Sequence, residues 1–288
     1  MVRISAGIGE LRDGARAVVT NKNKYRQFRR LFFFFCLFLF LCPHLTARAF
    51  APSSSGGQSI HEGITRDALT HIVSDDSLKL IVEANDSQDK AGGEGALECR
   101  RHFDGGNLAA ALSYIDREKK KALNCAAEAD GDVQSRADAL RHFGLMLHCV
   151  QDFYSRSNYL EIELELPACR ANPFDIPLVD WSKLPDGYEG ALSGLGLAAA
   201  RHTDKADEKL NKDSELTPEG KKIVSGKISY YSVARELAVR ETQRQWNLFE
   251  ALIRARCPER SAAVIAALKQ AGAEISTASG GSKAPEDN

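Results

Sequence analysis

The chain has 288 residues, of which 43% are hydrophobic and 27% are charged, which is typical of a globular protein with a sizeable core and excludes a fibrous one. The formal net charge of -1 is unevenly distributed. Residues 1–49 hold nine of the 38 Lys and Arg and two of the 39 Asp and Glu, which leaves about -8 for the rest. Because phosphate contacts require clustered Lys and Arg, nucleic-acid binding is not expected.

The first 49 residues have the pattern of an export signal. A basic region precedes the apolar run Leu31–Cys42, which is shorter than the roughly 20 residues that a membrane span needs. The tripeptide Ala-Arg-Ala at 47–49 then matches a small-x-small cleavage site. We therefore expect cleavage after Ala49 and a mature chain that begins at Phe50, in the periplasm or outside the cell. The alternative is an uncleaved membrane anchor.

The part of the chain before the central helix is expected to be helical. Apolar residues recur at helical spacing over 60–73, and a second short helix or turn is expected over 75–84. Residues 85–96 are polar and Gly-rich, which indicates a loop. A further helix is expected from about 108 to 129, followed by a turn over 130–133 that leads into the central helix.

Past the central helix, residues 160–166 alternate apolar and acidic side chains, which is a strand signal. Residues 167–190 contain four Pro and indicate a long ordered loop over the core. A long helix is expected from 218 to 256 and a last one over 260–271. The fold class is therefore all-α: a single-domain helical bundle of five to seven helices with long loops over 50–274, followed by a disordered tail over 275–288.

Five cysteines follow the expected cleavage site, and an odd number leaves at least one thiol unpaired. An oxidising compartment would permit disulfides. Cys99 and Cys125 are a candidate pair, although the sequence does not fix the connectivity. Cys149 is expected to be a buried thiol in the central helix.

The stretch Leu140–Glu161 concentrates the chemistry, because an apolar helix ends there in a dense set of polar groups. His148 and Asp152 are four residues apart, so both side chains project from one helix face. An imidazole and a carboxylate at this spacing suit a divalent ion such as zinc. The alternative is a hydrogen-bonded structural pair. His142 lies well round the helix and is expected to be structural or partly exposed.

Two further polar groups fall at predicted helix ends. His61 lies at the start of the first helix, where a lone histidine is by default a capping or surface group. His102 and Asp104 flank Phe103 just before a loop. Because sites in helical bundles are assembled from distant segments, these groups and the His148–Asp152 pair are expected to converge.

Four segments resemble the HET-C family, the heterokaryon-incompatibility proteins of fungi and their bacterial relatives. More distantly they resemble the zinc-dependent phospholipase C and single-strand nuclease superfamily, which is all-α with a three-zinc cluster. The resemblance covers about 59–249. The segments are His61-Glu-Gly-Ile-Thr-Arg-Asp-Ala-Leu69, His102-Phe-Asp104, His148-Cys-Val-Gln-Asp-Phe-Tyr-Ser-Arg-Ser-Asn158 and Leu210-Asn-Lys-Asp-Ser214.

The resemblance implies that His61, Asp104, His148 and Asp152 bind zinc and that Asp104 also orients the attacking water. Such a centre would hydrolyse a phosphodiester such as a phospholipid, at a membrane surface.

Several positions depart from the relatives' pattern. Arg156 stands where the family usually has a histidine, and Asn158 where the phospholipases have one. Arg cannot ligate a metal. We expect Arg156 and Asn158 to bind substrate instead. His202 is the remaining candidate for a further ligand, so one zinc site is expected rather than three.

Three hypotheses remain open at this point. The first is an exported zinc-dependent phosphodiester hydrolase. The second is a non-catalytic HET-C-like domain whose degenerate metal site binds a lipid headgroup or a protein. The third is a helical bundle in which the polar clusters form only hydrogen-bond networks. The first two require His61, Asp104, His148 and Asp152 to converge within a few ångströms.

Overall fold

The molecule is organised around one long helix, α6 (Val133–Arg156), in a computed structural model that describes residues 59–90, 100–103, 108–184 and 210–271. Asp132 caps its N-terminus by accepting hydrogen bonds from the backbone amides of Gln134 and Ser135. From Met146 to Tyr154 every side chain is buried, so α6 is surrounded rather than laid on a surface.

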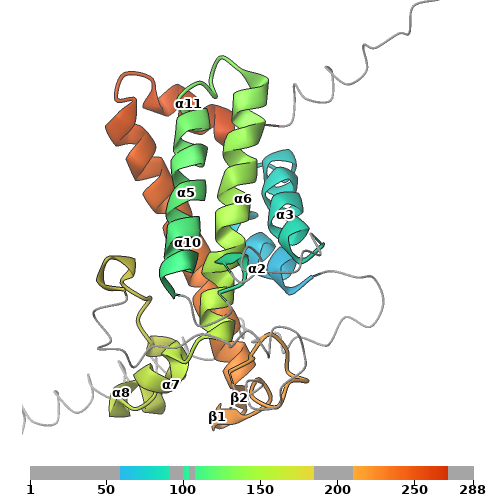
Figure 1. Ribbon diagram of the computed structural model, residues 1–288, viewed down its shortest axis with the longest axis vertical. Coiled ribbons are helices and arrows are strands. Elements are labelled where there is room, and N and C mark those ends of the chain that lie inside the picture. Colours follow the sequence, from blue (N-terminus) through green and yellow to red (C-terminus); the bar gives the residue numbers. More distant parts are fainter. Residues whose placement is uncertain (1–58, 91–99, 104–107, 185–209, 272–288) are drawn as a thin grey trace, which may run out of the picture. The chain divides into compact units, whose positions relative to one another are not determined.

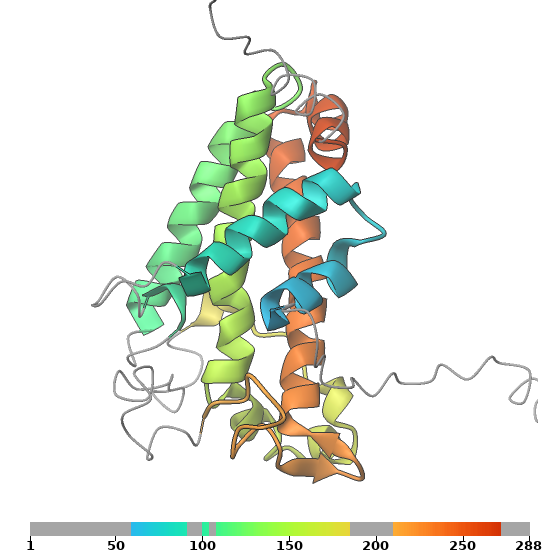
Figure 2. The ribbon, with the colours of Figure 1, turned by 90° about the vertical axis from the view of Figure 1, so that its right-hand side faces the viewer.

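Four helices surround α6. The helices α3 (Asp75–Lys90), α5 (Leu108–Ala126) and α10 (Tyr230–Arg256) pack directly on it, and α2 (Ile60–Leu69) packs on α3 and α10. Figures 1 and 2 show α5, α6 and α10 running side by side while α3 and α2 cross them. The short helix α11 (Ser261–Lys269) packs against α6 and α10.

Shorter elements gather at the C-terminal end of α6 (Figure 1). The buried Glu241 of α10 holds part of this region, since it accepts hydrogen bonds from the Tyr154 hydroxyl and the Trp181 indole. Two strands pair antiparallel, with Ile223 opposite Ser229, across a turn that contains Gly226 in the left-handed region (φ 57°). The elements are α7 (Tyr159–Glu163), α8 (Pro167–Ala171), η1 (Pro173–Asp175), η2 (Trp181–Lys183), β1 (Ile223–Ser225) and β2 (Ile228–Ser229).

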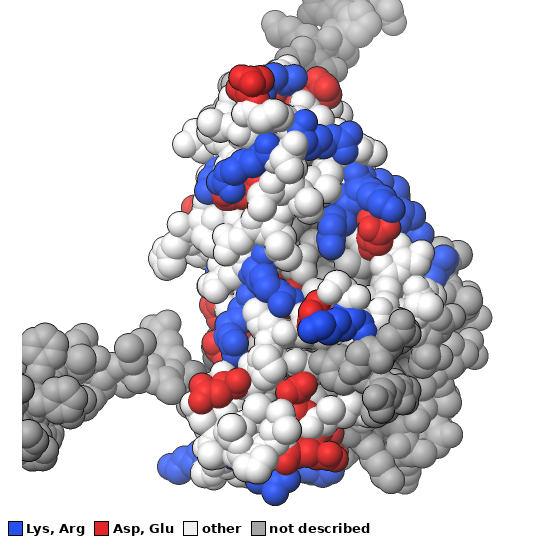
Figure 3. All heavy atoms as spheres, turned by 90° about the vertical axis from the view of Figure 1, so that its left-hand side faces the viewer, with Lys and Arg blue, Asp and Glu red and all other residues white. Residues whose placement is uncertain are grey.

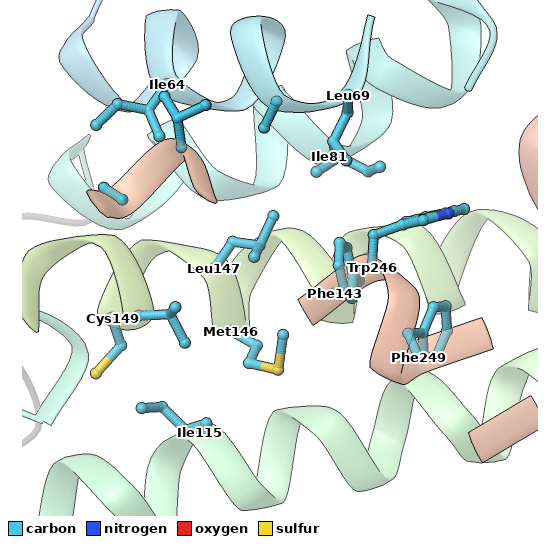
Figure 4. Packing of buried hydrophobic residues seen from close by; sticks show 14 of the residues in the cluster. Ile64, Leu69, Ile81, Ile115, Phe143, Met146, Leu147, Cys149, Trp246 and Phe249 are labelled. Carbon is cyan, nitrogen blue, oxygen red and sulfur yellow. The ribbon is translucent and has the colours of Figure 1, made fainter. Parts of the chain in front are cut away.

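An aromatic cluster fills the core between α6 and α10. The ring of Phe143 stacks on Phe249 at 5.1 Å between centroids and meets Trp246 edge-to-face at 5.4 Å. Figure 4 shows this cluster beside the aliphatic layer of Ile81 and Leu147. All of these side chains are buried, so apolar burial is the main force that holds α6 in place.

Gly144 allows α3 to approach α6 closely. A Cβ atom at this position would lie 2.3 Å from the carbonyl oxygen of Ile81, which is far inside contact distance. The absence of a side chain therefore sets the distance between the two helices. One turn beyond, the same contact brings Asn85 of α3 to His148 of α6.

The all-α fold class is confirmed, because the described residues are mostly helical and hold one small two-stranded sheet. The strand signal at 160–166 does not correspond to a strand: Tyr159–Glu163 forms α7, where the amide of Ile162 donates to the carbonyl of Asn158, and no described strand lies alongside. The expected loop at 85–96 is wrong over 85–90, because α3 continues to Lys90. The long helix begins at Tyr230 rather than 218, after the hairpin.

Three other expectations concern the ends of the chain and the cysteines. The export signal over 1–49 and the tail over 275–288 lie outside the described residues. Among the helices that are described, none is long and apolar enough to cross a membrane. Cys99 of the candidate Cys99–Cys125 pair also lies outside the described residues, and Cys125 is a free thiol. The buried Cys149 thiol donates to the carbonyl of Arg100.

Candidate metal centre

Five side chains from four segments meet beside the C-terminal half of α6. Asp152 Oδ1 lies 3.2 Å from His61 Nε2, and Asp152 Oδ2 lies 3.3 Å from both His148 Nε2 and His102 Nδ1. Asp89 Oδ1 is 3.6 Å from His148 Nε2 and 3.9 Å from His102 Nδ1. Two overlapping ligand sets share His148: one with His61 and Asp89, the other with His102 and Asp152. Either set could hold a metal ion.

Local structure explains how each ligand reaches the cluster. His148 and Asp152 are neighbours on one face of α6 because they are four residues apart. His61 lies in the first turn of α2, two residues after Ser59, whose hydroxyl caps the helix at the amide of Glu62. His102 precedes Phe103, whose backbone is left-handed (φ 57°) and whose ring packs edge-to-face on Phe153. This packing offsets the cost of an unfavourable backbone conformation beside the site.

Buried amides fix which nitrogen of two histidines faces the cluster. His61 Nδ1 lies 2.9 Å from Gln151 Oε1, and His148 Nδ1 lies 2.9 Å from Asn85 Oδ1. Both amide oxygens are acceptors, so each Nδ1 carries a hydrogen and each Nε2 is the nitrogen that faces Asp152. This arrangement matches the outer partners that orient histidine ligands in metal proteins.

The direction of this amide network is set at one hydroxyl. Thr242 donates to the carbonyl of Ala238, so its oxygen accepts from Gln151 Nε2. Gln151 Oε1 therefore faces the opposite way, where it accepts from His61 and from Asn85 Nδ2. Because Asn85 donates there, its own oxygen is left to accept from His148. The hydroxyl of Thr242 on α10 thus determines, through Gln151 and Asn85, which atoms donate and which accept at both ligand histidines.

Part of the donor spacing is close to that around a tetrahedral ion. Bonds of about 2.0–2.1 Å in a tetrahedron place the donors about 3.3–3.4 Å from one another. Asp152 Oδ2 lies 3.3 Å from both His148 Nε2 and His102 Nδ1, whereas His61 Nε2 lies 3.2 Å from the other oxygen, Oδ1. One separation is shorter: His148 Nε2 and His102 Nδ1 are 2.8 Å apart, which is a hydrogen bond, so these two rings must move apart slightly to share an ion.

The buried carboxylate of Asp152 dominates the charge of the centre. Asp152 is fully buried, and its Oδ1 lies 3.2 Å from His61 Nε2 and 3.4 Å from Arg156 Nε without a hydrogen bond of good geometry to the described residues. Burial alone would raise the pKa of Asp152, but Arg156, His148 and His61 together hold it well below its usual value, so the group is a carboxylate. Because positive groups already face this oxygen, a bound metal ion would have to replace one of these pairings.

A proton and a metal ion compete for His61. Burial disfavours its charged form, but the Asp152 carboxylate outweighs this and raises the pKa of His61 to about 9. Burial and the charge of His61 lower the pKa of His148 to about 4. In the ion-free protein His61 is therefore protonated at neutral pH and His148 is not. Metal binding must displace the proton from His61.

Arg156, one turn past Asp152, lies at the edge of the centre. Its Nε is 3.4 Å from Asp152 Oδ1 and 3.0 Å from Asp213 Oδ2. Its side chain is largely buried, and it lines a pocket of about 150 Å³ together with His61 and Asp89. The pocket therefore opens onto two candidate ligands and two guanidinium groups, those of Arg156 and Arg235.

The structure brings together three of the sequence-predicted ligands, His61, His148 and Asp152. His61 is thus a buried member of the cluster rather than the capping or surface group that its position indicated. Asp104 and His202 lie outside the described residues, so their roles stay predictions. Asn158 starts α7 and is not among the described residues that line the pocket; its assignment to substrate stays a prediction.

Sequence reasoning missed Asp89, Asn85 and the role of Gln151. Asp89 and Asn85 fell in a segment that was expected to be a loop, where acidic and amide side chains carry no signal. Gln151 could have been found, because it is three residues from His148 and shares its helix face. His142 behaves as expected: it is partly exposed and pairs with Glu118 at 2.8 Å, away from the centre.

Comparisons with protein-family models, with curated proteins and with solved structures found no match to the chain. The chemistry of the centre is therefore inferred from the geometry and charge of its own residues.

Proposed function

We propose that the protein is an exported, metal-dependent hydrolase of phosphodiester bonds, with zinc as its ion. One observation carries the proposal: three imidazoles and a buried carboxylate converge, with the outer nitrogens of His61 and His148 committed to amide oxygens. Imidazole and carboxylate donors, part of them close to tetrahedral spacing, suit zinc. The resemblance of the same segments to HET-C proteins and zinc-dependent phospholipases supports this reaction class.

The chain's own residues divide the work of such a reaction. A divalent ion at this centre lowers the pKa of water and polarises a phosphoryl oxygen. Arg156, at the pocket wall, supplies a guanidinium that matches phosphate oxygens. Asp89 is partly exposed at the same wall and is placed to accept a proton from an entering water. Asp104 remains a second candidate for orienting that water. A phospholipid at a membrane surface is the proposed substrate.

A specific contact favours a second candidate function, a non-catalytic domain with a degenerate site. Arg156 Nε lies 3.4 Å from Asp152 Oδ1, where a fixed positive charge repels a metal ion. In that case the guanidinium takes the place of the cation, and the pocket binds a lipid headgroup or a protein without hydrolysing it.

Metal analysis of the purified full-length chain, combined with assays on bis(p-nitrophenyl) phosphate, tests the first candidate. We expect at least one zinc per chain and hydrolysis that is lost on chelation and restored by zinc. Asp152→Ala should abolish both metal binding and turnover. His142→Ala, on the same helix but away from the centre, is the matched control and should keep both. A wild-type chain that holds no stoichiometric metal after incubation with zinc would overturn the proposal.

Arg156→His distinguishes the two candidates. If the site is degenerate, removing the guanidinium should raise the zinc content, because a repelling charge becomes a ligand. If the protein is a hydrolase, zinc content should stay the same while hydrolysis of bis(p-nitrophenyl) phosphate falls. If both the zinc content and the turnover were unchanged, Arg156 would have no role in either candidate function.

A further inference from the structure

The pocket beside the metal centre has a cationic wall of its own. Arg156, Lys212 and Arg235 line it, against the two carboxylates of Asp89 and Asp213. The side chains of Arg156 and Arg235 are only 17% and 13% exposed, so each guanidinium is held in place rather than extended into solvent. Partly desolvated guanidinium groups on one pocket wall are typical of a site for a phosphate or carboxylate.

A buried lysine fixes the first of these arginines. Lys212 is fully buried, and its Nζ donates to the carbonyls of Ser157 and Leu210 and to Glu161 Oε1, at 2.8–2.9 Å. All three of its hydrogens are thus committed, and the bond to Ser157 ties this loop to the end of α6. The next residue, Asp213, meets Arg156 Nε at 3.0 Å. Lys212 therefore acts as a positioning residue rather than a ligand group.

The second arginine, Arg235, is held by a residue from an earlier part of the chain. Arg235 belongs to the first two turns of α10 and forms an ion pair with Asp67 of α2, the helix that begins beside His61. The two arginines thus reach one pocket from α6 and α10, each paired with a carboxylate from a different segment. Figure 2 shows α2 lying against α10 on this side of the bundle.

One part of the remaining wall is apolar. Ile60 and Ile64 of α2 and Ala234 and Ala238 of α10 form it, beside Tyr231. A volume of about 150 Å³ corresponds to roughly five water molecules. This space admits a phosphate with a compact organic substituent.

We infer that this pocket is an anion site for a small phosphate ester, in which Arg156 and Arg235 hold the phosphate and the apolar wall contacts its substituent. The inference rests on the proposed function only in naming the substrate class, because the arginines bind the anion without an ion at the metal centre. The phosphate could belong to a free ester or to a lipid headgroup.

Calorimetric titration of the chelated full-length chain tests the site apart from the metal centre. We expect inorganic phosphate and glycerol 3-phosphate to bind one per chain, the ester more tightly, and both more weakly at high salt. Arg235→Gln and Arg156→Gln should each weaken binding at least tenfold. Arg254→Gln is the matched control, since Arg254 also belongs to α10 and pairs with a carboxylate, Glu250, but does not line the pocket.

Each outcome has a distinct meaning. Phosphate binding that requires zinc and ignores both substitutions would overturn the anion site and leave the hydrolase proposal standing. Phosphate binding in a chain that never binds zinc would support the anion site and overturn the hydrolase. If Arg235→Gln does not fold, Arg156→Gln decides alone. Sedimentation with vesicles that contain phosphatidic acid separates the sources: arginine-dependent binding indicates a lipid headgroup, and its absence indicates a free ester.

Discussion

Two consecutive and largely buried stretches of α6, called here its apolar half (residues 143–147) and its polar half (residues 148–152), are held by different forces. In the first half Phe143, Met146 and Leu147 contact apolar side chains, and burial itself stabilises them. In the second half His148, Gln151 and Asp152 have almost no exposed surface, yet burial of such groups costs free energy unless each is hydrogen-bonded. The comparison shows that the polar half depends on hydrogen-bond partners from other helices, whereas the apolar half needs only close packing against apolar side chains.

This dependence singles out the polar half as the candidate functional site. Thr65, Asn85 and Thr242 come from three different helices and satisfy Gln151 and His148. A core needs no such network for stability, since well-packed apolar residues would serve as well or better. The one buried oxygen that this network leaves without a hydrogen bond, Asp152 Oδ1, faces the candidate ligands.

Charge on the surface does not single out another site on the face that Figure 3 shows. Lys and Arg side chains there are interspersed with Asp and Glu rather than joined into one continuous basic surface. The charged groups that distinguish this protein therefore lie at the metal centre and in the adjoining pocket.

The largest expected effect is in the apolar half. Phe143→Ala should destabilise the protein by about 3–5 kcal/mol, because it removes a ring that stacks on Phe249 and leaves a cavity. Metal bound per folded chain should stay unchanged, since no ligand contacts Phe143. Urea denaturation and metal analysis of the folded fraction measure the two quantities. A folded variant that loses its metal would mean that the halves are not separable.

A smaller loss of stability is expected where α3 approaches α6 closely. Gly144→Ala places a methyl group against the carbonyl of Ile81 and should cost about 1–3 kcal/mol by overpacking. Because α3 must then move away from α6, the variant should also lose metal affinity through Asn85 and Asp89. Gly131→Ala is the control, since nothing lies near a Cβ there. Unchanged zinc affinity in Gly144→Ala would contradict the role given to this close approach.

In the polar half, Gln151→Leu should lower zinc affinity by about 10–100-fold while leaving every ligand in place, because His61 loses the acceptor that orients it. Gln151→Glu keeps the acceptor for His61 Nδ1 but loses the donor to Thr242, so it should lower the affinity less than Gln151→Leu does. Gln134→Leu is the same substitution on the exposed start of α6 and should have no effect. Competition with a zinc-sensitive dye measures the affinities; equal affinities for the two Gln151 variants would rule out an orienting role.

The smallest expected effect is the release of a proton when the metal ion binds. At pH 7 the ion-free protein holds a proton on His61, whose pKa is about 9, so each bound ion should release about one proton. Zinc affinity should accordingly rise about tenfold per pH unit up to about pH 9 and then level off. Calorimetry in buffers with different ionisation enthalpies counts the protons. No proton release at pH 7 would show that His61 is not a ligand.

The sequence predicted the parts of this molecule that local spacing controls. The helical class, the central helix and the His148–Asp152 pair all follow from a period of 3.6 residues, which holds wherever a helix forms. The strand signal at 160–166 did not lead to a strand, because a strand needs a neighbouring strand to pair with. Alternation over a few residues does not specify that partner.

Only the tertiary structure decided which groups complete the centre. His61 and His102 are 87 and 46 residues from His148 and reach it because α2 and the 100–103 turn pack there, not because of any pattern around them. Asp89 was hidden in a polar stretch with weak helical preference, which becomes helix because α3 packs on α6 at Gly144. Helix periodicity is encoded locally, whereas convergence of donors depends on which helix faces are buried together.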